Sequence, residues 1–243
     1  MELMGKMPAD CIDLISADPP YNLSSGGFTC HAGRRVSVNK GKWDESNGIE
    51  GDYNFHLNWI RACRRILKPS GTIWISGTYH SIFSCGFALQ MAGYKILNDI
   101  AWFKPNAAPN LSGRYFTASH ETLIWARKDP NAKHIFNYKE MKFGSWTEDQ
   151  LKKQDKQMRS VWSIPTPSAS EKKLGKHPTQ KPLRLLNRII QASSNRGDIV
   201  FDPFTGSSTT GIAAYLLGRN FIGTDLEEEY LRLSKARFEN LCL

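Results

Sequence analysis

The last part of the chain carries the pattern of a strand, a glycine-containing loop, a helix and a second strand. An apolar run from Asp198 to Phe204 is followed by a loop, Thr205 to Gly211, and by a helical stretch, Ile212 to Leu217. A second strand pattern, Asn220 to Asp225, ends in a carboxylate about twenty positions after the loop, a spacing typical of a site that binds ribose hydroxyls. This unit predicts an α/β fold in which a nucleoside ligand binds at the carboxyl ends of parallel strands.

The glycines of this loop do not match two common nucleotide-binding loops. A dinucleotide fingerprint has glycine at its first, third and sixth positions, but Ser208 occupies the third position counted from Gly206. A P-loop requires lysine and then Ser or Thr after its second glycine, whereas Ile212 and Ala213 follow Gly211. Because no lysine is placed to hold β/γ-phosphates, a nucleoside ligand without polyphosphate remains, and S-adenosylmethionine fits that description.

A tetrapeptide of unusual composition, Asp18-Pro19-Pro20-Tyr21, follows an earlier apolar run that predicts a buried strand over Ile12–Asp18. The prolines fix φ and restrict the residue before them, so Asp18 is held extended at the carboxyl end of that strand. The prolines have no N–H, so their carbonyls form an acceptor cluster beside an aromatic ring. Such a cluster suits a flat, amino-bearing ring such as an unstacked nucleobase, and an ordinary proline turn is the alternative.

Strands and helices alternate along the chain, which predicts a doubly wound, mostly parallel sheet in a single domain over residues 1–243. Further strands are expected over Thr72–Ser76, Lys95–Phe103 and Glu121–Trp125, and helices over Phe55–Leu67, His80–Ala92, Pro182–Ala192 and Glu227–Asn240. Residues 22–51, rich in Gly, Ser and basic residues, are predicted to form a mobile loop over the target base, with plain disorder as the alternative. Residues 129–176 show no clear periodicity.

The charge of the chain favours a polyanionic partner. Lys and Arg number 32 against 23 acidic residues, which gives a net charge of +9, although ordinary basic proteins share such an excess. The cysteines form no CxxC pair and no zinc spacing, so we expect reduced thiols, a cytoplasmic location and no metal. They are Cys11, Cys30, Cys63, Cys85 and Cys242. No apolar run approaches membrane-spanning length, so we expect no membrane partner.

Four motifs in a fixed order resemble the amino-group DNA methyltransferases of the β arrangement. In that family the catalytic segment precedes the target-recognition region, and the cofactor-binding segment comes last. The matching segments are Asp18–Tyr21, His177–Pro182, Asp202–Thr210 and Asn220–Asp225. The resemblance covers essentially the whole chain. It implies the class I S-adenosylmethionine-dependent methyltransferase fold with a circularly permuted motif order, and a target-recognition insert over residues 129–176.

The resemblance also implies roles for individual residues. The catalytic residues would be Asp18, Pro19, Pro20 and Tyr21, and the cofactor-binding residues Asp18, Asp202, Phe204, Gly206, Ser207, Ser208, Thr209, Asp225 and Lys181. Contacts with DNA are expected from Arg34, Arg35, Lys40, Lys42, Arg114, Tyr115, Lys152, Lys153, Lys172 and Lys173. A surface position is the alternative for Lys181, and a structural role is the alternative for Arg114 and Tyr115. We expect His177 to be structural or to line the cofactor site rather than to act as a base.

Two departures from the family pattern concern the cofactor site. Ser208 stands where the family usually has a second loop glycine, and a serine is tolerated there if its φ stays negative. Relatives carry a short strand before the first helix that ends in an acidic residue near the cofactor adenine. The chain begins at Met1, inside the segment that resembles that helix, so either the start is late, the chain is truncated or residues are omitted, and the affinity for the cofactor stays open.

Within the family the chain is most similar to the single-strand-capable adenine methylases of DpnII-type restriction systems. The similar segments are Val36–Gly41 with Trp43-Asp44, Leu67–Pro69, Trp74–Gly77, Ala108–Ser112 and Arg114–Thr117. The similarity implies N6 methylation of adenine in GATC, on duplex and single-stranded DNA, beside a cognate restriction endonuclease with which no stable complex is implied. A homodimer stays open.

Two other functions remain at this point. Cytosine-N4 methyltransferases share the scaffold but more often have serine where Asp18 stands, so Asp18 favours adenine. A non-catalytic relative that only binds nucleic acid is the other alternative, and the intact Asp18, Tyr21 and Asp225 argue against it.

Overall fold

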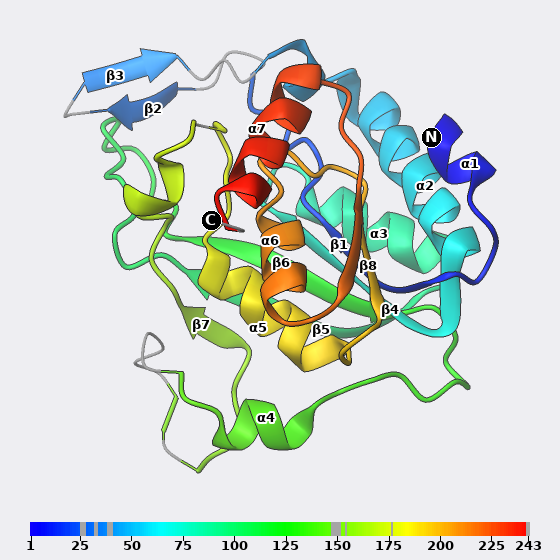
Figure 1. Cartoon of the computed structure of the whole chain (residues 1–243). Helices are drawn as coiled ribbons and strands as arrows, with labels where there is room; N and C mark the ends of the chain where they lie inside the picture. The colour runs from blue at the N-terminus through cyan, green and yellow to red at the C-terminus, as the bar shows by residue number, and fades with distance from the viewer. Residues whose placement is uncertain are drawn as a thin grey trace.

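The computed structural model describes residues 1–24, 28–31, 34–37, 41–146, 152–153, 155–175 and 177–241, with only the backbone described for 28–31, 34–37 and 42. A seven-stranded sheet with the order β7-β5-β6-β4-β1-β8-β9 forms the centre of the molecule (Figure 1). Its strands are β1 Ile12–Ala17, β4 Leu67–Gly77, β5 Lys95–Phe103, β6 His120–Arg127, β7 Val161–Ser163, β8 Ile199–Asp202 and β9 Asn220–Gly223. Only β6, paired antiparallel with β4 and β5, departs from the parallel direction, so the predicted mostly parallel sheet is confirmed.

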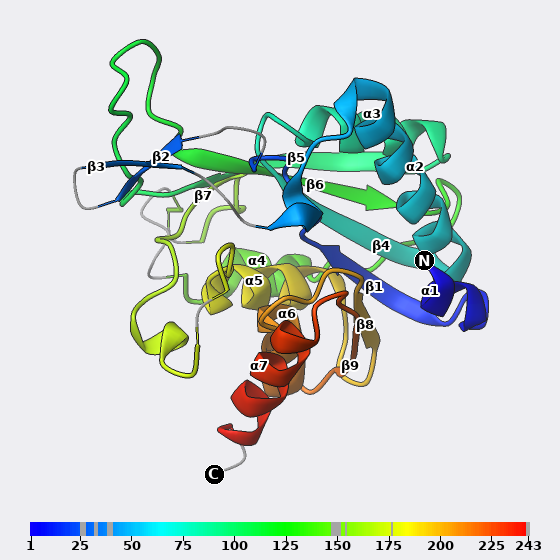
Figure 2. The ribbon, with the colours of Figure 1, turned by 90° about the horizontal axis from the view of Figure 1, so that it is seen from above.

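Helices cover both faces of the sheet, as a doubly wound fold requires. The helices are α1 Glu2–Lys6, α2 Gly48–Ile66, α3 Ile82–Met91, α4 Tyr138–Phe143, α5 Leu183–Ser193, α6 Thr209–Leu216 and α7 Glu228–Glu239. Figure 2 shows α1, α2 and α3 on one face and α5, α6 and α7 on the other. Among the helices of the described residues, none has the length and apolar character to cross a bilayer.

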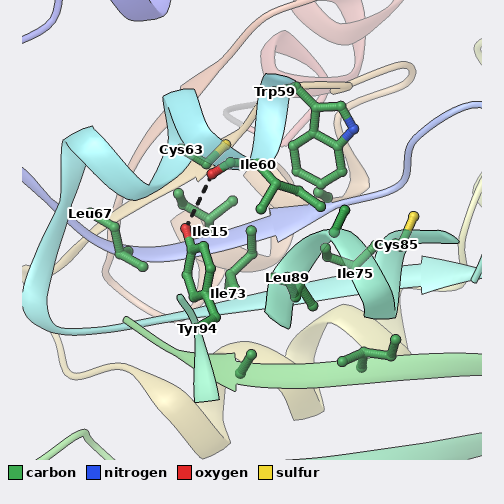
Figure 3. Close-up of a cluster of buried hydrophobic side chains, with 14 of the residues drawn as sticks. Ile15, Trp59, Ile60, Cys63, Leu67, Ile73, Ile75, Cys85, Leu89 and Tyr94 are labelled. Atoms are coloured by element: carbon green, nitrogen blue, oxygen red, sulfur yellow. Dashed lines mark hydrogen bonds between the residues drawn. The ribbon is translucent and has the colours of Figure 1, made fainter. Parts of the chain in front are cut away.

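The two faces of the sheet bury two separate apolar clusters, because successive strand residues point to opposite sides. Ile15 belongs to the cluster beneath α2 and α3, and its neighbour Leu14 belongs to the cluster beneath α5 and α6. Figure 3 shows the first cluster, where the hydroxyl of Tyr94 donates to the carbonyl of Ile60 at 3.5 Å. Burial of each large apolar side chain contributes about 1.5–3 kcal/mol, which holds the helices against the sheet and keeps the strand ends in place.

Residues 22–51 contain more regular structure than the predicted loop. Strands β2, Phe28–His31, and β3, Arg34–Ser37, pair as an antiparallel hairpin, and a 3-10 turn covers Lys42–Asp44. The helix α2 begins at Gly48 rather than at Phe55. Its first turn is solvent-exposed, with Ile49 88 % exposed, so no apolar periodicity marks it in the sequence. The role of this segment over the target base stays a prediction.

Residues 129–176 also contain short elements that the sequence did not indicate. The helix α4 has six residues and the strand β7 has three, which is too short for a periodic pattern to emerge. Strand β7 extends the sheet beyond β5 through the pairs Ala101–Val161 and Trp102–Trp162. The segment therefore first forms α4 outside the sheet and then adds β7 to the edge of the sheet.

Candidate active site

The predicted catalytic and cofactor motifs meet at one edge of the sheet. Asp18 follows β1, Asp202 ends β8 and Asp225 follows β9, and the carboxyl ends of these parallel strands lie together. A cavity of about 380 Å³ opens there. Its lining includes Asp18, Pro19, Pro20, Tyr21, Lys181, Asp202, Phe204, Gly206, Ser207, Thr209 and Asp225. The structure thus brings together all predicted catalytic and cofactor residues, except that Ser208 does not belong to the described lining.

The loop after β8 is held in place by Asp225. One carboxylate oxygen of Asp225 accepts the N–H of Gly206 at 2.8 Å, and the other accepts the N–H of Glu227 at 3.0 Å. Gly206 has φ +49°, and a Cβ added there would lie 3.0 Å from Nε2 of His177. Glycine is therefore required by both the backbone conformation and the close approach of the imidazole. Each Asp225 oxygen keeps a second lone pair for a ligand hydroxyl.

Asp202 is a buried residue whose carboxyl group belongs to the lining of the cavity. Its Oδ1 accepts the N–H of Phe204 at 3.0 Å. Burial, together with the nearby charges of Asp18 and Asp225, raises the pKa of Asp202 to about 7. A cationic ligand group in this cavity would favour the ionised form of this carboxyl.

Ser208 corrects the expectation of a negative φ. It has φ +57° and ψ +38°, at the position that precedes α6, and its side chain is buried. The left-handed conformation costs an L-residue roughly 1–2 kcal/mol, and here the hydroxyl of Ser208 accepts a hydrogen bond from Thr205 Oγ1 at 3.2 Å. The serine takes the glycine conformation, and this hydrogen bond offsets part of the strain.

Two substitutions at Ser208 should separate these contributions. Ser208→Gly should change the free energy of unfolding by less than about 1 kcal/mol, because relief of strain offsets the lost hydrogen bond. Ser208→Val should lower it by about 2 kcal/mol or more, since a β-branched residue is disfavoured at positive φ and overpacks a buried site. Urea unfolding of both variants checks this, and equal stability of Val and Gly would contradict the left-handed assignment.

Asp18 accepts hydrogen bonds on both carboxylate oxygens. Its Oδ1 accepts the hydroxyl of Tyr21 at 2.6 Å and the hydroxyl of Ser76 at 2.7 Å. Its Oδ2 accepts the ammonium of Lys181 at 2.5 Å. Lys181 is buried, so the alternative of a surface lysine is wrong. Burial disfavours the Lys181 ammonium, but the carboxylates of Asp18 and Glu121 outweigh burial and raise its pKa.

Glu121 completes this network, although none of the four sequence motifs contains it. It lies near the start of β6, which is antiparallel and therefore begins at the edge where β4 ends. Its Oε2 accepts the hydroxyl of Tyr21 at 3.0 Å, and its Oε1 accepts the ammonium of Lys104 at 3.1 Å. Burial works against the Glu121 carboxylate, but Lys181 and Lys104 outweigh burial and lower its pKa. An acidic residue at the start of an apolar strand pattern was the available signal.

The hydroxyl of Tyr21 lies between two carboxylates. Tyr21 is 5 % exposed, and the ammonium of Lys181 lies 5.0 Å from its ring centroid. Burial, followed by the charges of Asp18 and Glu121, raises the pKa of Tyr21 well above its usual value. The phenol therefore stays protonated, and its single proton serves either Asp18 or Glu121 at one time.

Asp44 is a second residue whose role the sequence did not indicate. Its Oδ1 accepts the backbone N–H of Tyr21 at 2.8 Å and of Asn22 at 2.9 Å, and its Oδ2 accepts the N–H of Leu23 at 3.0 Å. Asn22 has φ +60°. The carboxylate of Asp44 thus fixes the backbone turn that follows the catalytic motif.

The comparisons with known proteins agree with this geometry. Residues 12–236 match the sequence model of the DNA methylase family. The chain belongs to the DNA methylase family. It is 50 % identical over 242 residues to the type II methyltransferase M2.DpnII of Streptococcus pneumoniae, a match that covers 98 % of this chain and 86 % of that protein. It is also 50 % identical over 237 residues to the type II methyltransferase M2.LlaDCHI of Lactococcus lactis subsp. cremoris, covering 97 % and 85 %.

A solved structure supports both the family and the fold of this DNA methylase. The crystal structure of the M1.HpyAVI–SAM complex is 31 % identical in sequence and has a TM-score of 0.68. The match covers 97 % of this methylase and 91 % of that chain. The predicted DNA methyltransferase activity and the class I methyltransferase fold are confirmed by these findings.

The cavity of the methylase fits the predicted cofactor, S-adenosylmethionine. Its volume of about 380 Å³ lies in the usual range for small-molecule sites. Acidic groups, Asp202 and Asp225, and aromatic rings, Trp59 and Phe204, share its wall, which suits a cationic nucleoside. His177 also lines the wall, with its ring 4.2 Å from the ring centroid of Tyr230, in agreement with a lining role.

The residues predicted to contact DNA are only partly described. The loop between β5 and β6 presents Arg114 and Tyr115 to solvent, with Tyr115 68 % exposed. Asn110 orders this loop, because its Nδ2 donates to the carbonyl of Tyr115 at 2.7 Å. Lys153 and Lys173 are exposed, and Lys152 and Lys172 are half-buried. The side chains of Arg34, Arg35 and Lys42, and the whole of Lys40, lie outside the described residues.

Proposed function

We propose that this methylase transfers a methyl group from S-adenosylmethionine to N6 of adenine in GATC, on duplex and single-stranded DNA, within a restriction-modification system. One observation carries the chemical part of the proposal: Asp18 and Pro19 line the same cavity as the Gly206 loop that Asp225 holds. Acceptors for an amino group and a carboxylate placed to bind ribose hydroxyls therefore line the same cavity. The GATC target is supported by the resemblance to DpnII-type methylases and by the identity to M2.DpnII.

The site residues act on the amino group of the base. The lone pair of adenine N6 is delocalised into the ring, so this nitrogen is a poor nucleophile. The carboxylate of Asp18 and the carbonyl of Pro19 accept hydrogen bonds from the two N–H groups of this nitrogen. These hydrogen bonds favour a tetrahedral nitrogen with an available lone pair. When bound, S-adenosylmethionine supplies the electrophilic methyl group. Tyr21 stacks on the flipped base with a ring that is fixed at its hydroxyl end by Asp18 and Glu121.

Adenine is favoured over cytosine because of the residue that heads the catalytic motif. Cytosine-N4 methyltransferases more often carry serine at the position of Asp18. Here the carboxylate of Asp18 accepts three hydrogen bonds, from Tyr21, Ser76 and Lys181, and therefore belongs to a built site. Nucleoside analysis of DNA methylated by this protein separates N6-methyladenine from N4-methylcytosine.

The partner of the site is DNA, to which the basic residues named above contribute phosphate contacts. A single strand has already lost base pairing, so presentation of its adenine costs less than flipping from a duplex. Tyr115 and Phe116, which are 68 % and 97 % exposed, supply rings on which unpaired bases stack. The protein acts in the cytoplasm beside a cognate restriction endonuclease, without a stable complex, and a homodimer is compatible with this function.

Matched oligonucleotides test the target. We expect methylation of single-stranded and duplex DNA that contains GATC, and at least about 100-fold slower methylation of a scrambled site, because mismatched bases cost about 1–3 kcal/mol each. Tritium transfer from labelled S-adenosylmethionine measures both rates. Methylation of duplex only, or equal methylation of the scrambled site, would overturn the target while leaving the enzyme class unchanged.

A further inference from the structure

The buried network around Asp18 leaves this carboxylate engaged by the protein itself. Oδ1 of Asp18 accepts the hydroxyl of Ser76 at 2.7 Å and, when the Tyr21 proton points to Asp18 rather than to Glu121, the hydroxyl of Tyr21 at 2.6 Å, so that both of its lone pairs are then filled. Oδ2 receives the ammonium of Lys181 at 2.5 Å, a short charge-assisted hydrogen bond. A neutral amino group that approaches Asp18 therefore competes with a buried cation for the same oxygen.

Glu121 offers Lys181 a second carboxylate at the same place. Its Oε2 lies 3.6 Å from the ammonium of Lys181, beyond hydrogen-bond distance but within reach of a small movement. The side chains of Lys181 and Glu121 are 9 % and 12 % exposed, so solvent ions screen their attraction little. Glu121 does not belong to the described lining of the cavity, whereas its neighbours Lys181 and Tyr21 do, so its carboxylate acts on the cavity through these two side chains.

We propose that Glu121 is a positioning residue that draws Lys181 away from Asp18 as the substrate amino group enters, and so frees Oδ2 to accept an amino hydrogen. The inference rests on the role that the proposed function gives to Asp18. The ammonium of Lys181 needs to move by about 1 Å to bring its distance to Glu121 into the usual range of a charge-assisted hydrogen bond. The exchange therefore needs no rearrangement of the backbone.

The charges of the network allow this exchange. Asp18 and Glu121 are balanced by Lys181 and Lys104, and Lys104 holds the far oxygen of Glu121 at 3.1 Å. The near oxygen stays directed at Lys181 and Tyr21. Transfer of the ammonium from Asp18 to Glu121 keeps every ion in the network next to an opposite charge, which avoids the cost of an unpaired buried charge.

The substitution Glu121→Gln tests the exchange. Glutamine keeps the size and an acceptor for Tyr21 but removes the charge that draws Lys181, so Lys181 should stay on Asp18. We expect kcat to fall at least about tenfold with the dissociation constant of S-adenosylmethionine within about twofold of the original value. Glu239→Gln, which removes an exposed charge on α7, is the matched control and should leave kcat unchanged.

Addition of Lys181→Met to Glu121→Gln distinguishes a positioning role of Glu121 from a merely structural one, because only a positioning role predicts that kcat recovers. Once Lys181 is absent, Oδ2 of Asp18 is free whether or not Glu121 is present. The double variant that combines Glu121→Gln with Lys181→Met should therefore have a higher kcat than Glu121→Gln alone, at saturating S-adenosylmethionine and DNA. Losses that add up in the double variant would overturn the inference. An unchanged kcat for Glu121→Gln would also overturn it.

Two further measurements keep the result interpretable. If Glu121→Gln shows no cooperative thermal transition, Glu121→Asp replaces it, because aspartate keeps the charge but holds Lys181 from farther away; its smaller loss of kcat should be relieved by Lys181→Met in the same way. Asp18→Ala is assayed alongside. Retained activity in Asp18→Ala would refute the proposed function, whereas full loss there with an unaffected Glu121→Gln would refute only the exchange.

Discussion

Replacement of Asp18 by alanine is expected to slow methyl transfer by at least about 100-fold while the protein stays folded. Asp18 faces the cavity from the end of β1, so its loss removes the acceptor of the amino hydrogen without opening the apolar core. Lys181 keeps the carboxylate of Glu121 as its partner, so no buried charge is left alone. Single-turnover tritium transfer measures the rate, and thermal unfolding measures the fold.

The control for this experiment is Asp99→Ala, which removes an exposed carboxylate on β5. Its rate should equal that of the unmodified protein. Asp18→Asn is a sharper probe, because asparagine keeps one acceptor oxygen but presents an amide donor to Lys181 and to the substrate. A rate for Asp18→Ala within tenfold of the original, a loss of only about 1.4 kcal/mol, would exclude the catalytic role assigned to Asp18.

Replacement of Asp225 by alanine is expected to weaken S-adenosylmethionine binding by about 1.5–3 kcal/mol, the usual contribution of a hydrogen bond to a charged group. Asp225 lines the cavity after β9, and its Oδ2 also holds the N–H of Gly206. The substitution therefore removes the acceptor of the ribose hydroxyls and loosens the loop against which the cofactor lies. Isothermal calorimetry measures the affinity.

Two variants separate these contributions. Asp225→Asn keeps an oxygen that can accept the N–H of Gly206, so it should lose less affinity than alanine if the loop is the larger effect. Glu228→Ala removes an exposed acid in the first turn of α7 and serves as the matched control. Calorimetry that gives the same dissociation constant for Asp225→Ala and for the unmodified protein would show that this carboxylate does not bind the ribose.

The predicted elements and the observed ones agree best where a helix or strand buries a long apolar stripe. Helix α5, Leu183–Ser193, lies within one residue of the predicted Pro182–Ala192, because its buried face carries Leu185, Leu186, Ile189 and Ile190 at helical spacing. The helix α2 was predicted only from Phe55, since its first turn contacts solvent and carries no apolar signal. The helix α4, with six residues, is too short to show a helical period, and the strand β7, with three, is too short to show an alternating one.

The sequence by itself determined the fold class, the order of the motifs and the gathering of Asp18, Asp202 and Asp225 at one edge, because the carboxyl ends of parallel strands meet there. Tertiary structure alone decided what surrounds those carboxylates. Glu121 comes from an antiparallel strand about a hundred residues away from Tyr21, and no local pattern indicates that its carboxylate meets that hydroxyl. The burial of Lys181 has the same origin, because its partners Asp18 and Glu121 are distant in the sequence.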